Sequence, residues 1–251
     1  MLRGWVIFFE RWWVKFSERH RSERRLLIIV EDLDKLSIAD ARRVFIENSN
    51  LLTGLQANLI YTIPIFTFYS PDASALTAVF DHDFSLPMIK VFEPNWDRAN
   101  GFDIVKDIVH RRVAKSAIDE DALDLLIIKT AGVLRHVFEV LQTASSMTTL
   151  REPPIQKKHI EYGLGRLKGN MGLQIALPQP AIAGVDKVEQ LYDKLVEYAK
   201  LRATGKKCPS TSDARVQVLL QSCALVEYNG ARWLGVHPLV LEFLKDLDYP
   251  V

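Results

Sequence analysis

An acidic cluster follows an unbroken apolar run early in the chain. Leu26–Val30 is apolar throughout and contains three β-branched residues, and Glu31, Asp32 and Asp34 follow within four positions. A continuous apolar run of strand length predicts a parallel strand that is covered on both faces. Carboxylates at the carboxyl end of such a strand lie where open α/β sheets bind their ligands. Since Mg²⁺ is bound by few carboxylates and keeps several waters, the cluster indicates a magnesium site; the alternative is a buried strand that ends in a solvated acidic turn.

The elements that must position these acids follow along the chain. Residues 38–50 have a helical pattern, and Leu59–Ile63 is a second apolar, β-branched run that predicts a neighbouring parallel strand. A third strand is expected at Met88–Val91, and this order is typical of half of a doubly wound sheet. Residues 5–20 carry aromatic side chains at three- and four-residue steps. They predict a helix packed against the sheet, the alternative being a membrane-surface or partner-binding helix.

From Asn95 the pattern becomes helical. Helices are expected at residues 96–114, 119–130, 131–146 and 155–173. A Pro/Gly-rich linker at 177–184 then marks a domain boundary.

Beyond the linker the pattern predicts helices and a β-hairpin. Two helices are expected, at 185–203 and 212–222, and the second has three candidate capping residues, Ser210, Thr211 and Ser212. Two alternating strands flank Asn229-Gly230, which is a strong hairpin signal. A last helix is expected to start at His237-Pro238.

The acidic segment, read as apolar strand, two acids, Leu and Asp, resembles the Walker B segment of P-loop ATPases, in particular the AAA+ and related STAND-like signalling ATPases. In that family the two acids act on Mg²⁺ and on the attacking water. The resemblance therefore implies that Glu31 and Asp32 bind Mg²⁺ and serve catalysis, and that Asp34 belongs to the same ATP site. The tip of the next strand, Tyr61 or Thr62, matches the sensor-1 position.

A second resemblance lies in TAGVLRHVFEVL, which is similar to the sensor-2 helix of the AAA+ lid. There a turn of small residues precedes an arginine that contacts the nucleotide phosphates, and Arg135 is the matching residue. An arginine in the first turn of a helix can reach an anion beside the positive end of the helix dipole.

The order of elements resembles such an ATPase over nearly the whole chain. It implies an α/β fold with a partial P-loop NTPase parallel sheet in residues 1–94, an α-helical lid in 95–176 and a winged-helix domain in 184–251. The winged helix is implied by helices followed by a β-hairpin.

The chain departs from the family in three ways. No segment matches the phosphate loop, G-x-x-x-x-G-K-[ST]. Glu31 stands where the family usually has Asp, and no arginine occurs between Arg43 and Arg98, where an arginine finger would be expected. We therefore expect the C-terminal portion of an ATPase that is inactive alone and binds ATP and Mg²⁺ only with the missing N-terminal half. That half, or a second copy of the chain, would be its partner.

Composition excludes some partners. Charge is balanced, with 32 Lys and Arg against 31 Asp and Glu, so no global field favours nucleic acid or membrane. The two cysteines match no metal or redox spacing, and the apolar start is too short to span a bilayer. These features predict a soluble, cytoplasmic protein.

The C-terminal region is poorly equipped to bind DNA. Residues 184–251 carry nine Lys and Arg and nine Asp and Glu, and DNA binding depends on neutralising phosphates. The helix at 212–222 offers only Arg215, Gln217 and Gln221 to a groove. A protein contact is therefore favoured over DNA; if DNA is bound, the candidate residues are Lys206, Lys207, Arg215 and Arg232. The alternative function is a non-enzymatic winged-helix regulator, binding DNA or protein, with a vestigial ATPase core.

Overall fold

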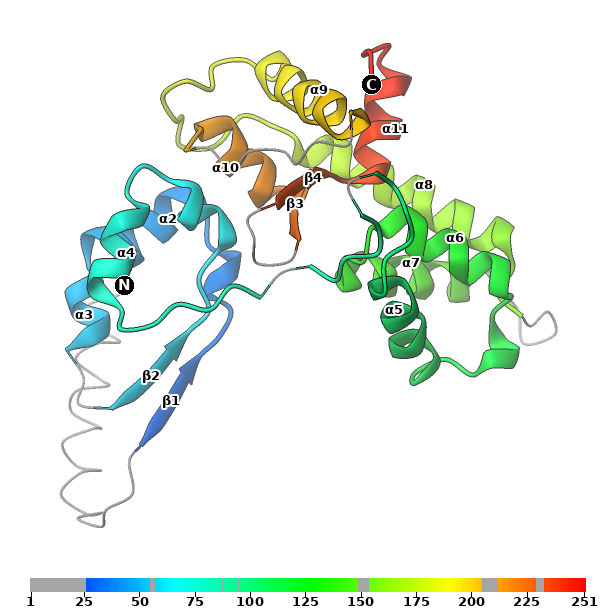
Figure 1. Ribbon diagram of the computed structural model, residues 1–251, viewed down its shortest axis with the longest axis horizontal. Helices are drawn as coiled ribbons and strands as arrows, with labels where there is room; N and C mark the ends of the chain where they lie inside the picture. The colour runs from blue at the N-terminus through cyan, green and yellow to red at the C-terminus, as the bar shows by residue number, and fades with distance from the viewer. Residues whose placement is uncertain are drawn as a thin grey trace. The chain divides into compact units, whose positions relative to one another are not determined.

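The computed structural model describes residues 26–54, 57–86, 88–93, 95–148, 154–204, 212–228 and 233–251. The chain divides into two compact units, residues 1–84 and 85–251, whose elements are labelled in Figure 1. The regions expected as a lid and as a winged helix both lie in the second unit. The helix predicted at 5–20 lies outside the described residues. None of the described helices is both long and apolar enough to cross a membrane.

The first unit is built on two parallel strands. β1 (Leu27–Val30) pairs with β2 (Asn58–Tyr61), and Val30 lies opposite Tyr61 at the end of the pair. The predicted strand pair and the helical connection between its strands are confirmed. The connection contains η1 (Leu33–Lys35), α2 (Ile38–Arg42), the π-helical η2 (Arg43–Glu47) and α3 (Ser49–Thr53). After β2 come η3 (Ile65–Tyr69) and α4 (Ala73–Val79).

The two faces of this sheet differ in burial. Leu27, Ile29 and Ile60 are 53%, 55% and 50% exposed, whereas the alternate residues are partly buried. Among the described residues only one face of the pair is packed, whereas the sequence predicted cover on both faces; the helix predicted to pack on the sheet, at 5–20, lies outside them. Successive strand residues point to opposite faces, and a continuous apolar run does not reveal that only one face is packed.

The prediction that Met88–Val91 forms a third strand of this sheet is wrong. Met88 forms an isolated parallel bridge with Tyr228, and its N–H donates to the carbonyl oxygen of Glu227 at 3.0 Å. The segment belongs to the second unit, in which Val91 is 1% exposed. An extended segment can pair with any free strand edge, and here it pairs with the C-terminal hairpin.

The second unit contains the predicted helices and hairpin in the predicted order. Its first helices are α5 (Gly101–His110), the short η4 (Lys115–Ala117), α6 (Glu120–Thr130), α7 (Leu134–Met147) and α8 (Lys157–Gln174). They are followed by α9 (Glu189–Ala203), α10 (Ala214–Gln221), β3 (Leu225–Tyr228), β4 (Trp233–Val236) and α11 (Pro238–Asp246). β3 and β4 are antiparallel, while the Asn229-Gly230 turn lies outside the described residues.

Several helix starts differ from the prediction by a few residues, and two of them have a clear local cause. α5 starts at Gly101 and not at Trp96, because Trp96 has a positive φ of 70° in a turn where its N–H donates to the carbonyl oxygen of Glu93. α10 is capped by Asp213, whose side chain accepts from the N–H of Arg215. Ser212 is therefore not the cap, and the other two candidates, Ser210 and Thr211, lie outside the described residues.

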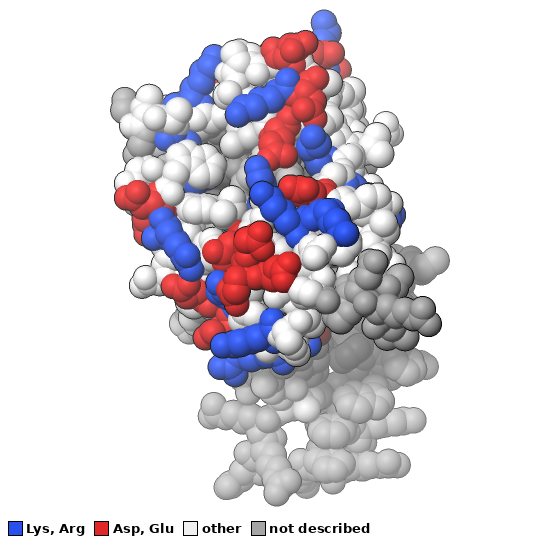
Figure 2. All heavy atoms as spheres, turned by 90° about the vertical axis from the view of Figure 1, so that its right-hand side faces the viewer, with Lys and Arg blue, Asp and Glu red and all other residues white. Residues whose placement is uncertain are grey.

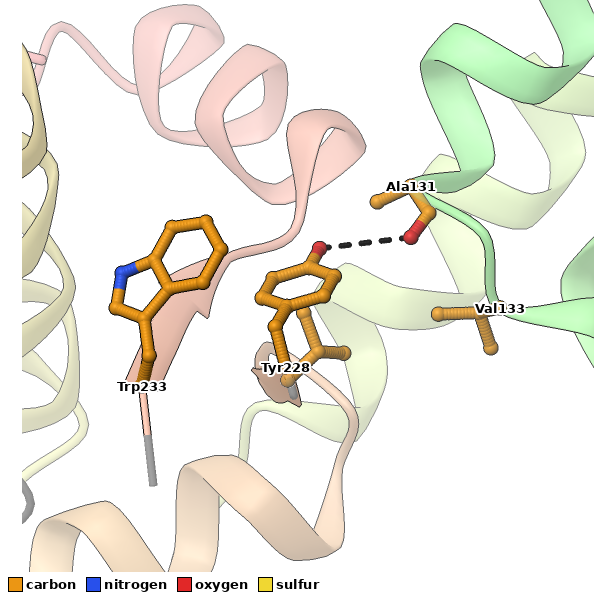
Figure 3. Packing of buried hydrophobic residues seen from close by; sticks show 5 residues of the cluster. Ala131, Val133, Tyr228 and Trp233 are labelled. Carbon is orange, nitrogen blue, oxygen red and sulfur yellow. Dashed lines mark hydrogen bonds between the residues drawn. The ribbon is translucent and has the colours of Figure 1, made fainter. Parts of the chain in front are cut away.

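The helices and the hairpin share one core. α8 packs against α6, α7 and α11, so the last helix of the chain lies on the predicted lid helices (Figure 1). The hairpin packs against the turn between α6 and α7 through Val226, Tyr228 and Trp233, which contact Ala131 and Val133 (Figure 3). The Tyr228 hydroxyl points at the carbonyl oxygen of Ala131, 3.5 Å away.

Two glycines let the segment at 89–91 pass through this core. A Cβ at Gly101 would lie 2.0 Å from the carbonyl oxygen of Lys90, and a Cβ at Gly132 would lie 2.1 Å from that of Ile89. Gly132 also has a φ of 78°, which side-chain-bearing residues rarely adopt. Both positions require glycine because another backbone occupies the place of a side chain.

We predict that Gly132→Ala lowers the free energy of unfolding by about 2 kcal/mol or more, from the left-handed conformation and the clash with Ile89. Gly165→Ala is the matched control: Gly165 lies inside α8, and a Cβ there meets nothing within 4 Å. The control should raise stability by about 0.5–1 kcal/mol. Urea unfolding of both variants measures the difference, and equal effects would contradict the described path of the 89–91 segment.

Candidate functional site

The parallel pairing of β1 and β2 brings the predicted acids and the predicted sensor residues to one sheet edge. Val30 lies opposite Tyr61, and the N–H of Thr62 donates to the carbonyl oxygen of Val30 at 3.1 Å. Glu31 and Thr62 therefore leave the two strands side by side. This is the carboxyl edge of the sheet, where α/β proteins bind ligands.

The acids at this edge are exposed. Asp32 has a left-handed backbone with φ 66°, and its Oδ1 lies 2.6 Å from the Lys35 ammonium. This ion pair is solvent-exposed, since the Lys35 and Asp32 side chains are 59% and 77% exposed. Such pairs contribute roughly 0–1 kcal/mol, so a divalent cation can replace the lysine.

Glu31, Asp32 and Asp34 do not form a three-acid metal site. Among the described residues, no three His, Cys, Asp or Glu side chains are grouped so that they could hold a metal ion. The turn at Asp32 leads straight into η1, which contains Asp34. A magnesium ion at this edge would therefore be held by fewer than three of these acids, with water and phosphate oxygens as its remaining ligands.

The two sensor-1 candidates differ in whether their hydroxyl groups are already hydrogen-bonded. The Tyr61 hydroxyl donates to the carbonyl oxygen of Leu52 at 2.8 Å, and burial raises the pKa of this phenol. The Thr62 hydroxyl oxygen is buried and has no hydrogen-bond partner among the described residues. A buried hydroxyl without a partner is costly, so the Thr62 hydroxyl retains an unused hydrogen-bonding capacity that the Tyr61 hydroxyl lacks. The geometry favours Thr62 over Tyr61.

Arg135 lies where the resemblance implies, in the first turn of α7. The turn before it contains two left-handed residues, Ala131 with φ 53° and Gly132 with φ 78°. The Arg135 side chain is exposed. It belongs to the second unit, whereas Glu31, Asp32 and Thr62 belong to the first.

Next to Arg135, a buried histidine pair joins α7 to α11. His136 Nδ1 lies 3.2 Å from His237 Nε2, and the two side chains are 7% and 0% exposed. His237 caps α11, because its Nδ1 accepts from the N–H of Leu239. That bond places the His237 proton on Nε2, from which it is donated to His136. The pair thereby fixes the first turn of α7, which carries Arg135.

The pKa values of both imidazoles are strongly lowered. Burial lowers the pKa of His136 to about 4, with a further contribution from the charge of Arg135. Burial also lowers the pKa of His237 to about 3, helped by His136 and opposed by the backbone of Thr130. The sequence contained no sign of this pair, because its members are 101 positions apart.

Where the structure describes the residues predicted to contact DNA, they are paired or buried. The Arg215 guanidinium is held by Asp213, with Nη2 2.7 Å and Nε 3.1 Å from the carboxylate oxygens. Residues 216–220 of α10 are all buried, so Gln217 is not presented to a groove as expected. Lys206, Lys207 and Arg232 lie outside the described residues. On the face shown in Figure 2, side chains of both signs are interspersed.

Because of the buried histidine pair, we predict that the free energy of unfolding decreases as the pH is lowered. Because the folded pKa values lie below the unfolded value of about 6.5, the neutral pair stabilises fully above that pH. Its contribution is lost progressively as the pH falls from about 6.5 to about 4. For His136 alone the loss is on the order of 3 kcal/mol.

Urea unfolding between pH 7.5 and 4.5 tests this loss in a His136→Leu/His237→Asn double variant, in which asparagine retains a capping oxygen. The double variant should show a clearly shallower pH dependence than the wild type. His82→Asn, at an exposed histidine, should not change it. The same slope in the wild type and the double variant would contradict the assignment.

Comparisons with known proteins establish no family. No protein-family model matches the chain, and a search of curated proteins found no match. Among solved structures, the chain is similar to an arginine-to-alanine variant of RuvB from Thermotoga maritima, at 13% identity and a TM-score of 0.36. The similarity covers 90% of this chain and 70% of that one. A TM-score of this size does not establish a common fold, and the function proposed below rests on the geometry of the site.

Proposed function

We propose that this chain contributes the magnesium-binding and sensor parts of an AAA+-like regulatory ATPase. The observation that carries the proposal is the parallel β1–β2 edge, where Glu31 and Asp32 follow β1 and Thr62, with its buried and unpartnered hydroxyl, follows β2. Parallel strands joined through helices place a polar cluster at the ligand-binding edge of an α/β sheet.

Each residue has a role that its chemistry allows. Glu31 and Asp32 hold Mg²⁺, and the Asp32 carboxylate exchanges its exposed contact with Lys35 for the metal and its waters. Thr62 donates to a phosphate oxygen or to the attacking water. In the second unit, Arg135 is the sensor-2 residue that the resemblance implies, and its place in the first turn of α7 suits contact with an anion. Phosphoryl transfer depends mostly on such positioning and charge neutralisation.

The 251 residues contain no phosphate loop. Tight ATP binding and turnover would therefore require such a loop from outside these residues, on another chain or another segment. The sequence predicted ATP and Mg²⁺ binding only together with the missing half. Because Glu31 and Asp32 are exposed at the β1–β2 edge, we now propose weak MgATP binding by the chain itself, without turnover. ATP hydrolysis by the chain at a rate abolished by Asp32→Ala would contradict this part of the proposal.

Calorimetry of MgATP binding tests the site directly. We expect a dissociation constant on the order of 0.1–1 mM, weakened about tenfold or more by Asp32→Asn, because a charged ligand to the metal is lost. Thr62→Val should also weaken MgATP binding, because valine has nearly the shape of threonine but lacks the hydroxyl group. Asp81→Asn, at an exposed acid of the same unit, is the matched control and should bind as the wild type does. Equal binding by Asp32→Asn and the wild type would overturn the assignment.

A second candidate is a non-enzymatic regulator in which the C-terminal helices and hairpin contact another protein. The burial of residues 216–220 and the Asp213–Arg215 pair favour this over DNA binding. We therefore expect no salt-sensitive affinity for duplex DNA in fluorescence anisotropy at roughly 50–200 mM salt, and no effect of Arg215→Ala. Steeply salt-dependent binding that Arg215→Ala removes would instead support a DNA-binding winged helix.

A further inference from the structure

The chain segment that leads out of the first unit is bound along the second. Residues 88–93 and 95–98, here called the strap, follow the exposed residues 81–86 and precede α5. A linker between two compact units is normally exposed and poorly held. This one contacts both the lid side and the C-terminal side of the second unit.

One end of the strap is hydrogen-bonded to the hairpin. The N–H of Met88 donates to the carbonyl oxygen of Glu227 at 3.0 Å, and the Met88 side chain packs against the cluster that contains Tyr228 and Trp233. Beyond Met88, the backbone passes close to Gly101 and Gly132, whose missing side chains leave room for it.

The other end of the strap is held by Arg202 of α9. The Arg202 guanidinium carbon lies 3.5 Å from the centre of the Trp96 ring and 5.7 Å from that of Trp233. Its Nη2 also donates to the carbonyl oxygen of Glu93 at 3.4 Å. Arg202 is 4% exposed although it is charged, whereas Trp96 is 42% exposed. Desolvated cation–π contacts are among the stronger ones of their kind.

We propose that α9 and β3 form a clamp that closes on the strap through Arg202 and Glu227, and that the strap is bound and released as one cooperative unit. This inference does not depend on ATP binding. In the closed state the free linker runs from the end of α4 to Met88, roughly eight residues with a root-mean-square span of about 16 Å. Release up to α5 lengthens it to roughly twenty residues and about 25 Å, which lowers the effective concentration of one unit near the other about fourfold. The clamp thus sets how closely the two units are tethered.

Hydrogen exchange tests whether the two ends are coupled. Trp96→Ala removes the stacking partner at one end and, because Trp96 is partly exposed, leaves the core intact. We expect the amide of Met88, at the other end, to exchange about tenfold faster, together with the amides of Glu93 and Ala99, since exchange tracks the population of the open state. The amides of α7 and α8 should exchange as in the wild type.

Two further variants complete the test. Arg202→Lys keeps the charge but loses the planar stacking group, and it should have the same effect as Trp96→Ala. Arg98→Ala is the control, because Arg98 makes a cation–π contact of similar length, 3.6 Å to the Phe102 ring, without touching the clamp. It should leave the Met88 amide unchanged.

Trypsin provides a second readout. No lysine or arginine lies between Arg43 and Lys90, so a cut at Lys90 produces an unmistakable fragment. This cut requires an open strap and should be accelerated in Trp96→Ala and Arg202→Lys but not in Arg98→Ala. An unchanged Met88 amide in Trp96→Ala would overturn the proposal, as would an equal acceleration of exchange throughout α7 and α8.

Discussion

The hydrogen bond from the Thr62 N–H to the Val30 carbonyl oxygen closes the parallel strand pair at the end where the acids emerge. The candidate site depends on this register. A slip of one residue would turn every side chain of β2 to the opposite face of the sheet, removing the Thr62 hydroxyl from the edge that carries Glu31 and Asp32. The candidate site thus depends on how the two strands pair and not on any single acid. The register also explains how two short strands with one half-exposed face can hold the acids and Thr62 in a fixed arrangement.

The second unit is organised by buried polar groups rather than by apolar contacts alone. Arg202 lies between two tryptophans, and the His136–His237 pair links the start of α7 to the cap of α11. Each such group would be costly if it lost its contacts, so it specifies one packing of its neighbours. These contacts join the predicted lid helices to the C-terminal helices and hairpin. The strap, the turn before Arg135 and the hairpin consequently share one core.

Local patterns in the sequence were sufficient to predict most elements. The apolar runs at Leu26–Val30 and Leu59–Ile63 correspond to β1 and β2, and His237-Pro238 begins α11. β3 and β4 flank the position of the hairpin signal Asn229-Gly230. Each signal is contained in a few adjacent residues. The prediction for Met88–Val91 failed because an extended segment carries no information about which strand edge it will meet. The half-exposed face of β1 was missed for a similar reason, since burial depends on what packs against the strand.

For the candidate site, the residue types at the strand ends could be predicted from the sequence. Which of their side chains are already hydrogen-bonded or buried could not. Tyr61 and Thr62 are adjacent in sequence, yet only the structure shows that the tyrosine hydroxyl is already bonded to Leu52. The helix expected to present Arg215 and Gln217 is instead buried along most of its length. The histidine pair and the stacking of Arg202 arise from contacts across about a hundred residues, which no local pattern encodes.

The proposed function depends on the binding of a divalent cation together with ATP at the β1–β2 edge. Mn²⁺ prefers the same oxygen ligands as Mg²⁺ and broadens the NMR signals of nearby nuclei. The most direct measurement is therefore the paramagnetic broadening of backbone amides on adding MnATP to the chain. We predict selective broadening of Glu31, Asp32 and Thr62, absent in Asp32→Asn. Broadening confined to other acidic segments, such as 81–83 or 119–124, would contradict it.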